Sequence, residues 1–196
     1  MKRVLTTALV PLLAAATLTA CGDGDKPSAH PSGHMQGHMS PATTAAHNAQ
    51  DVMFAQMMIP HHRQAVEMAG LAARRASSPK VKDLASRIAA AQDPEIAKMS
   101  GWLTAWKEPT SMPSMNHGSM DGMMSDRDMK ALGELTGKEF DRKFLTMMIE
   151  HHRGAVVMAQ TEQRSGSNPA ARALAASIVT TQTAEIATMR DLLKAR

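Results

Sequence analysis

Two pairs of adjacent histidines occur in nearly the same local sequence, and each pair follows two methionines in the pattern M-M-I-x-H-H-R. A methionine four residues before a histidine shares its face of a helix, so a thioether and an imidazole can lie side by side. Both groups bind copper-type ions. The candidate ligands are Met57, Met58, His61, His62, Met147, Met148, His151 and His152. A structural role stays open, because methionine often fills apolar cores and a buried histidine often makes a polar contact.

A second group of candidate ligands lies in a polar stretch, S-M-P-S-M-N-H-G-S-M-D-G-M-M, at residues 111–124. Methionine gives a solvated linker no structural benefit, whereas thioethers select Cu(I), and equally Ag(I), over Zn²⁺ and Mg²⁺. The expected ligands are Met112, Met115, His117, Met120, Met123 and Met124. The stretch therefore predicts a copper site. The alternatives are methionines placed by chance, or a short methionine-faced helix docked on the fold.

The histidine pairs belong to an internal repeat that covers most of the chain. Residues 51–69 return as residues 141–159, at an offset of 141 − 51 = 90. The register then holds without a gap as far as Met99 and Met189. A repeat of this size means two copies of one supersecondary unit that share a core.

Each copy has the pattern of a helical hairpin. In the first copy, apolar residues recur every three or four positions from Phe54 onward, which is the period of a helix. Ser78 and Pro79 then supply an N-cap and a first residue for a second helix. Pro60 and Pro94 lie inside these patterns. We expect kinks there rather than breaks, because the register continues past them.

Two such hairpins predict an all-α protein, a four-helix bundle with a pseudo-twofold axis. We place the bundle at residues 48–196, with the repeats at about 51–106 and 141–196. The connection between them, at about residues 107–135, is a long methionine-rich loop. A loop of that length is usually functional or disordered.

Neighbouring helical residues point about 100° apart, so one histidine of each pair faces the bundle axis more squarely than the other. The register predicts that these are His61 and His151, with the second histidine of each pair nearer a seam between helices. Glu95 and Glu185 lie beside the apolar stripe of the second helices. They need a partner, because an unpaired buried charge is costly. We expect His61 and His151 to supply it.

The N-terminus has the features of a bacterial lipoprotein signal. Two basic residues precede a mostly apolar stretch, which ends in L-T-A-C at Cys21. We predict a signal peptide at residues 1–20, lipidation of Cys21, and a flexible tether containing His and Met at residues 21–47. A transmembrane anchor is the alternative, but the stretch is short and Pro11 interrupts it. The expected location is the extracytoplasmic face of the cell membrane.

Composition argues against several other functions. Without the two basic residues of the signal, 22 − 2 = 20 basic residues face 18 acidic ones, which gives no case for nucleic acid. The single cysteine, once lipidated, leaves no disulfide and no thiolate site. A di-iron bundle needs Glu-x-x-His on two helices. None of Glu67, Glu95, Glu150 and Glu185 has a histidine three residues later. We therefore expect no enzymatic activity.

The segment D-x-x-F-x-x-M-M-I-x-H-H, followed by A-V-x-M-A and Q-x-x-E-I-x-x-M, occurs twice and resembles the DUF305 family over nearly all of residues 48–196. The resemblance implies a bacterial secreted protein with a ferritin-like helical bundle. Some members, the CopM-like group, are implicated in periplasmic copper binding. The residues that carry the resemblance are Asp51, Met57, Met58, His61, His62, Met68, Met99 and their counterparts 90 positions on. Differences such as Glu67 against Val157 show that the copies are not equivalent.

Together these features predict an extracytoplasmic copper-binding protein that buffers or delivers Cu(I) through methionine and histidine ligands. Such a protein would contribute to copper homeostasis or resistance. Its expected partners are the metal ion, the membrane through the lipid anchor, and a copper-handling protein. Two other interpretations stay open: a structural or interaction lipoprotein with a non-metal bundle, and a copper-dependent oxidoreductase.

Overall fold

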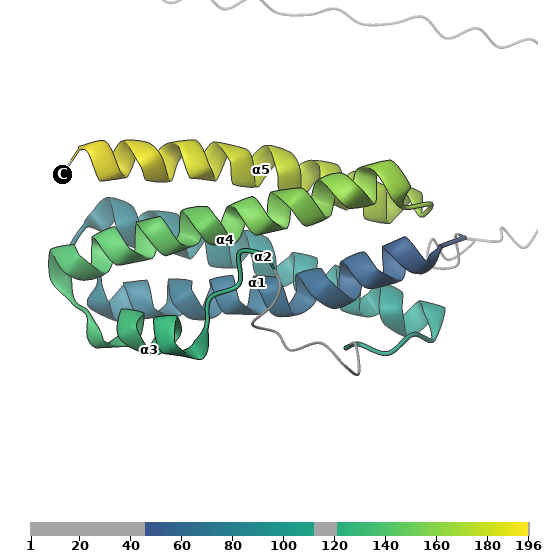
Figure 1. The fold of residues 1–196 in the computed structure, drawn as a ribbon, viewed down its shortest axis with the longest axis horizontal. Coiled ribbons are helices and arrows are strands. Elements are labelled where there is room, and N and C mark those ends of the chain that lie inside the picture. Colours follow the sequence, from purple (N-terminus) through teal and green to yellow (C-terminus); the bar gives the residue numbers. More distant parts are fainter. Residues whose placement is uncertain (1–45, 112–120, 196) are drawn as a thin grey trace, which may run out of the picture. The chain divides into compact units, whose positions relative to one another are not determined.

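The computed structural model describes residues 46–111 and 121–195 (Figure 1). The described residues form helices and no strand, which confirms the all-α prediction. The helices are α1 (Ala49–Arg75), α2 (Pro79–Trp106), α3 (Asp126–Glu134), α4 (Gly137–Ser165) and α5 (Pro169–Lys194). The signal peptide, Cys21 and nearly all of the tether lie outside the described residues, as do Met112, Met115, His117 and Met120.

The four long helices form two hairpins, α1–α2 and α4–α5, which pack mainly through α1 and α4. These two central helices run antiparallel, because the Asn48 side chain at the start of α1 donates a hydrogen bond to the Ser165 carbonyl at the end of α4. Both α1 and α2 continue through Pro60 and Pro94, as the unbroken register predicts. The bundle of two repeated hairpins is therefore confirmed.

The connection between the hairpins contains one element that the sequence analysis treated as loop. Helix α3 begins at Asp126, and the Ser125 hydroxyl caps it by accepting the Asp128 N–H at 3.1 Å. Acidic residues in the first turn suit the positive end of the helix dipole. Leu132 is fully buried, and Met129 packs against the same core. The last part of the connection is thus folded onto the bundle.

Two buried aspartates at equivalent repeat positions join one hairpin to the other. The backbone N–H groups of Ser77 and Ser78 each donate to the Asp141 carboxylate at 3.1 Å, so α4 caps the start of α2. Asp51 on α1 likewise accepts the Asn168 N–H at 2.9 Å, at the start of α5. Ser78 is the N-cap residue and Pro79 begins α2, as predicted, but the Ser78 side chain makes no capping hydrogen bond. A carboxylate from the other hairpin supplies the acceptor, and it is the stronger one because it is charged.

A third buried carboxyl group, that of Glu162, lies beside Asp51. Burial alone would raise the pKa of Asp51, but hydrogen bonds from the Glu162 side chain and from nearby backbone N–H groups lower it. Burial and the Asp51 carboxylate raise the pKa of Glu162 to about 8. Glu162 is therefore largely protonated in the folded protein near neutral pH, and Asp51 keeps the charge.

Glu162 should make the bundle less stable as the pH rises from about 4.5 to about 8. Its folded-state pKa of about 8 lies above the ordinary value of 4.5, so the folded state holds a proton that the unfolded state has lost between these limits. The contribution of this proton to stability is complete below about pH 4.5, falls by at most roughly 1.4 kcal/mol for each pH unit above that, and is lost by about pH 8. Glu162→Gln should remove that slope in denaturant titrations across this range. The exposed Glu67→Gln is the matched control, and an unchanged slope in Glu162→Gln would refute this assignment.

Candidate metal-binding site

The apolar core of the bundle is divided into two clusters. In α1 the division falls between Ile59 and Ala65, and in α4 between Ile149 and Ala155. The buried residues of α2 and α5 change cluster in the same way near their middles. The division is a polar layer that crosses the centre of the bundle. Its members are His61, His62, Gln92, Glu95, His151, His152, Gln182 and Glu185.

The centre of this polar layer is a pair of histidines from the two central helices. The rings of His61 and His151 have centroids 3.7 Å apart and planes tilted by 40°. Both side chains are fully buried. The two residues hold the same repeat position on antiparallel helices, so they meet where α1 and α4 cross. This is the orientation toward the bundle axis that the register predicts. We refer to His61 and His151 as the histidine pair.

Both members of the histidine pair are neutral at physiological pH. Burial, followed by the nearby His62 and His152, lowers the pKa of His61 to about 3. The carbonyl group of Asp121 lies near the His61 ring and acts in the opposite direction. Burial and the neighbouring histidines also hold the pKa of His151 well below its ordinary value. Neutral imidazole is the form that binds a metal ion, so neither ring has to lose a proton first.

The ring nitrogens of the histidine pair lack ordinary partners. None of the four makes a hydrogen bond that satisfies both distance and angle within the described part of the chain, although the Asp121 carbonyl group lies near the His61 ring and the His61 backbone lies near the His151 ring. The Gln92 side-chain amide also lacks a partner. Buried polar atoms nearly always have a partner, and leaving one without costs about 1–3 kcal/mol. The bundle thus keeps several basic nitrogen atoms in its interior at a cost in stability. That arrangement suits the binding of an ion.

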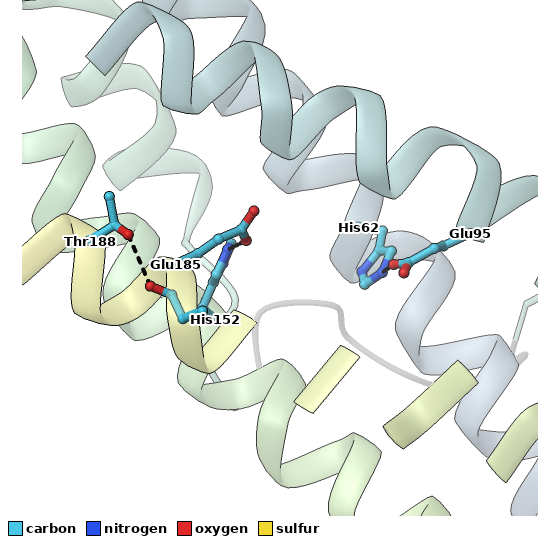
Figure 2. A network of polar contacts seen from close by, with 6 residues as sticks. His62, Glu95, His152, Glu185 and Thr188 are labelled. Atoms are coloured by element: carbon cyan, nitrogen blue, oxygen red, sulfur yellow. Dashed lines mark hydrogen bonds and ion pairs between the residues drawn. The ribbon is translucent and has the colours of Figure 1, made fainter. Parts of the chain in front are cut away.

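The second histidine of each pair has a carboxylate partner inside its own hairpin. His62 Nε2 lies 2.7 Å from a Glu95 oxygen, and His152 Nε2 lies 2.7 Å from a Glu185 oxygen (Figure 2). The expectation that His61 and His151 contact these glutamates is therefore wrong. A rotation of about 100° per residue takes His62 and His152 off the axis and toward α2 and α5. The glutamates hold the rings of His62 and His152 in place and, among the residues that the structure describes, make no hydrogen bond to the histidine pair.

Three of the four methionines beside the histidines, Met58, Met147 and Met148, belong to the apolar core clusters, and Met57 does not. Met58 and Met148 are fully buried, Met147 is 4% exposed and Met57 is half-buried. The packing of these three with leucine, isoleucine and phenylalanine side chains is the structural role that methionine commonly has. In the connection, Met123 and Met124 are half-buried, and Met124 packs against the core.

A groove leads to one side of the polar layer. It has a volume of about 660 Å³ between α2 and α5, where these helices make few contacts. Pro94, Glu95 and Trp102 line it from α2, and Leu174 lines it from α5. Glu95 is both a wall of this groove and the partner of His62. The polar layer therefore approaches solvent at Glu95.

The donor atoms present restrict the kind of ion. The described residues contain no cluster of three or more His, Cys, Asp and Glu side chains that could hold a metal. A hard ion such as Mg²⁺ or Ca²⁺ needs many oxygen ligands, and a structural zinc site needs four ligands. Two neutral imidazoles, with thioethers elsewhere, instead fit Cu(I) or Ag(I), which accept few ligands and prefer nitrogen and sulfur.

The sequence analysis missed two sets of residues at this site. Gln92 and Gln182 recur at one repeat position, and that recurrence of a polar residue within an apolar stripe was the available signal. Gln64 and Gly154 also share a repeat position, but they differ in type and gave no signal.

The fold and the polar layer define a class: helical bundles built from two repeated hairpins that hold histidines at the crossing of the central helices. The DUF305 family model, described as a domain of unknown function, matches residues 51–193. The chain belongs to the DUF305 family. A comparison with curated proteins found no match.

Several solved structures share this fold. A DUF305 protein from Streptomyces coelicolor, thought to be secreted, is 40% identical, with 74% of this chain and 91% of that chain covered and a TM-score of 0.69. A DUF305 fragment from Deinococcus radiodurans is 33% identical, with 78% of this chain and 100% of that chain covered and a TM-score of 0.71. CopM in its Cu(I)-bound form is 33% identical, with 74% of this chain and 95% of that chain covered and a TM-score of 0.62. CopM has also been solved in Cu(II)-bound and Ag-bound forms.

A membrane-spanning helix needs about 20 predominantly apolar residues. No helix in the described part of the chain is both long enough and apolar enough to cross a bilayer.

Proposed function

We propose that this protein binds Cu(I) on the extracytoplasmic side of the cell and buffers or delivers it. The observation that carries the proposal is the histidine pair: two neutral, fully buried imidazoles, 3.7 Å apart, whose nitrogens have no ordinary partner. The copper-bound and silver-bound forms of CopM support it, because that protein is a third identical to this chain.

The methionine-rich connection is the second part of the proposal. Met112, Met115, Met120 and Met123 lie in a sequence of small and polar residues, where thioethers would be free to wrap a soft ion. Met124 is set apart from these four, because its side chain packs against the core. We assign the four methionines to capture of the ion and Met124 to folding.

The sequence supports the location and the chemistry that we propose. The L-T-A-C motif supports a lipid anchor at Cys21, and a single acyl chain would need a second one for stable attachment. We propose no bond-making chemistry, because the histidine that a di-iron bundle needs three residues after a glutamate is missing after Glu67, Glu95, Glu150 and Glu185. The structural interpretation has one observation in its favour: His62 and His152 are already hydrogen-bonded to glutamates.

Substituting serine for Met112, Met115, Met120 and Met123 should remove part of the Cu(I) bound by the full chain. The histidine pair should still bind. The melting temperature of the metal-free protein should change little if these methionines serve the ion and not the fold, because substitutions away from a packed core usually shift stability by less than about 0.5 kcal/mol. The measurement is an anaerobic Cu(I) titration against a competing chelator, with Zn²⁺ as the control ion. Full stoichiometry in the variant would remove the connection from the proposal. Equal affinity of the wild-type protein for Zn²⁺ and Cu(I) would contradict the choice of ion.

A further inference from the structure

Residues 121–124, which precede α3, lie directly against the middle of the two central helices (Figure 1). We call them the docked segment. On α1, the Gln64 side-chain amide donates to the Met124 carbonyl oxygen at 2.8 Å. The Met124 N–H donates in return to the Gln64 Oε1 at 2.7 Å. This double hydrogen bond fixes the backbone of the segment on one side.

On the other side the docked segment touches the backbone of α4. A Cβ atom at Gly154 would collide with the carbonyl oxygen of Asp121. A Cβ atom at Gly122, whose φ is +82°, would lie 2.8 Å and 2.9 Å from the carbonyl oxygens of Glu150 and His151. A side chain at either glycine would therefore force the two backbones apart. Gly122 is also required for its positive φ, which other residues rarely adopt.

The two docking residues lie on the helix faces that carry the histidine pair. Gln64 follows His61 by three positions, and Gly154 follows His151 by three, since 64 + 90 = 154. Residues three apart on a helix are neighbours on its surface. The docked segment consequently covers this side of the histidine pair, and the nearby Asp121 carbonyl group acts on the His61 ring. The same repeat position therefore has two different roles: Gln64 on α1 makes the double hydrogen bond, and Gly154 on α4 makes the close backbone contact.

We propose that Gln64 and Gly154 are positioning residues that hold the docked segment as the outer wall of the histidine pair, and that an ion enters and leaves the pair past this wall. The inference rests on the proposed function, in which the pair binds Cu(I) or Ag(I). The other approach, the groove at Glu95, leads to His62, whose Nε2 already has a partner.

The test uses the full chain with silver alone as the probe, and it compares three variants. Gly154→Ala introduces the collision, and Gln64→Ala removes the double hydrogen bond without adding bulk. Gly70→Ala is the matched control, because a Cβ atom there meets nothing within 4 Å. Amide hydrogen exchange of the docked segment is measured first, without metal. Silver release to a chelator is then followed through the imidazole resonances of His61 and His151.

Both Gly154→Ala and Gln64→Ala should speed amide exchange in the docked segment and speed silver release about tenfold, the factor that corresponds to about 1.4 kcal/mol. Gly70→Ala should behave as wild type. Faster exchange with unchanged release would overturn the proposal and direct attention to the Glu95 groove. Unchanged exchange in both variants would overturn the docking itself. If wild type holds no silver at the pair, the proposed function fails and takes this inference with it, while the metal-free exchange data still report the docking.

Discussion

Replacing both members of the histidine pair with leucine should stabilise the metal-free protein and abolish Cu(I) or Ag(I) binding at this buried site, while the methionine-rich connection keeps its share. The double variant His61→Leu with His151→Leu removes four buried ring nitrogens that have no ordinary partner. Leucine is similar in size and apolar, so the two core clusters can join across the layer. We expect the free energy of unfolding to increase by about 2 kcal/mol. For a domain of this size, that corresponds to a rise of about 4–8 °C in melting temperature.

The matched control for this effect is Gln92→Leu with Gln182→Leu. It also makes the polar layer more apolar, because both glutamines are buried and have side-chain atoms without partners. It should raise the melting temperature while keeping silver binding, because the imidazoles are untouched. A histidine double variant that is less stable than wild type in the absence of metal would show that the pair is a structural contact. In that case the imidazoles would have partners that the geometry does not reveal.

Removing the Asp141 carboxylate should destabilise the bundle more than any single surface change. Three groups donate to this buried side chain: the backbone N–H groups of Ser77 and Ser78, and the Ser77 hydroxyl at 2.6 Å. Asp141→Ala leaves these donors without their charged acceptor and separates α4 from the turn before α2. Hydrogen bonds to charged groups contribute about 1.5–3 kcal/mol each and are not additive, so we expect a loss of about 3 kcal/mol in the free energy of unfolding.

Chemical denaturation of the metal-free protein measures that loss. Asp83→Ala is the control, because Asp83 is an exposed aspartate whose ion pair with Arg87 contributes little. Asp51→Ala should resemble Asp141→Ala, since Asp51 makes the equivalent contacts at the start of α5. If Asp141→Ala unfolds at the same denaturant concentration as Asp83→Ala, the cross-hairpin cap contributes nothing to stability.

The sequence was sufficient for the fold and for the position of the histidine pair. An apolar pattern with helical period, repeated at a fixed offset, requires two hairpins that bury their faces against each other. Equivalent positions on two related helices lie near the pseudo-twofold axis, which is why His61 and His151 could both be placed toward the bundle axis. Their contact with each other was not predicted. Their neutral state also follows from burial, because desolvation disfavours a charged imidazole.

The contacts between the repeats could not be predicted from either repeat alone. Asp141 caps the start of α2 at Ser77, which lies 64 residues earlier in the chain, so no local pattern links the two. The partner of Glu95 depends on a single step of helical rotation, and the sequence analysis chose the wrong histidine. The docked segment depends on a missing side chain at Gly154, and a single glycine in a helical pattern does not reveal which backbone will approach it.

The most direct test of the histidine pair as a metal site is nitrogen NMR of its imidazoles in the full chain, recorded before and after addition of silver. Silver is chosen because it does not change oxidation state during the measurement. The account predicts that the ring nitrogens of His61 and His151 shift and couple to the silver nucleus. It also predicts that the nitrogens of His62 and His152 that contact Glu95 and Glu185 keep their hydrogen bonds. Unchanged His61 and His151 resonances in a protein that binds silver tightly would contradict it.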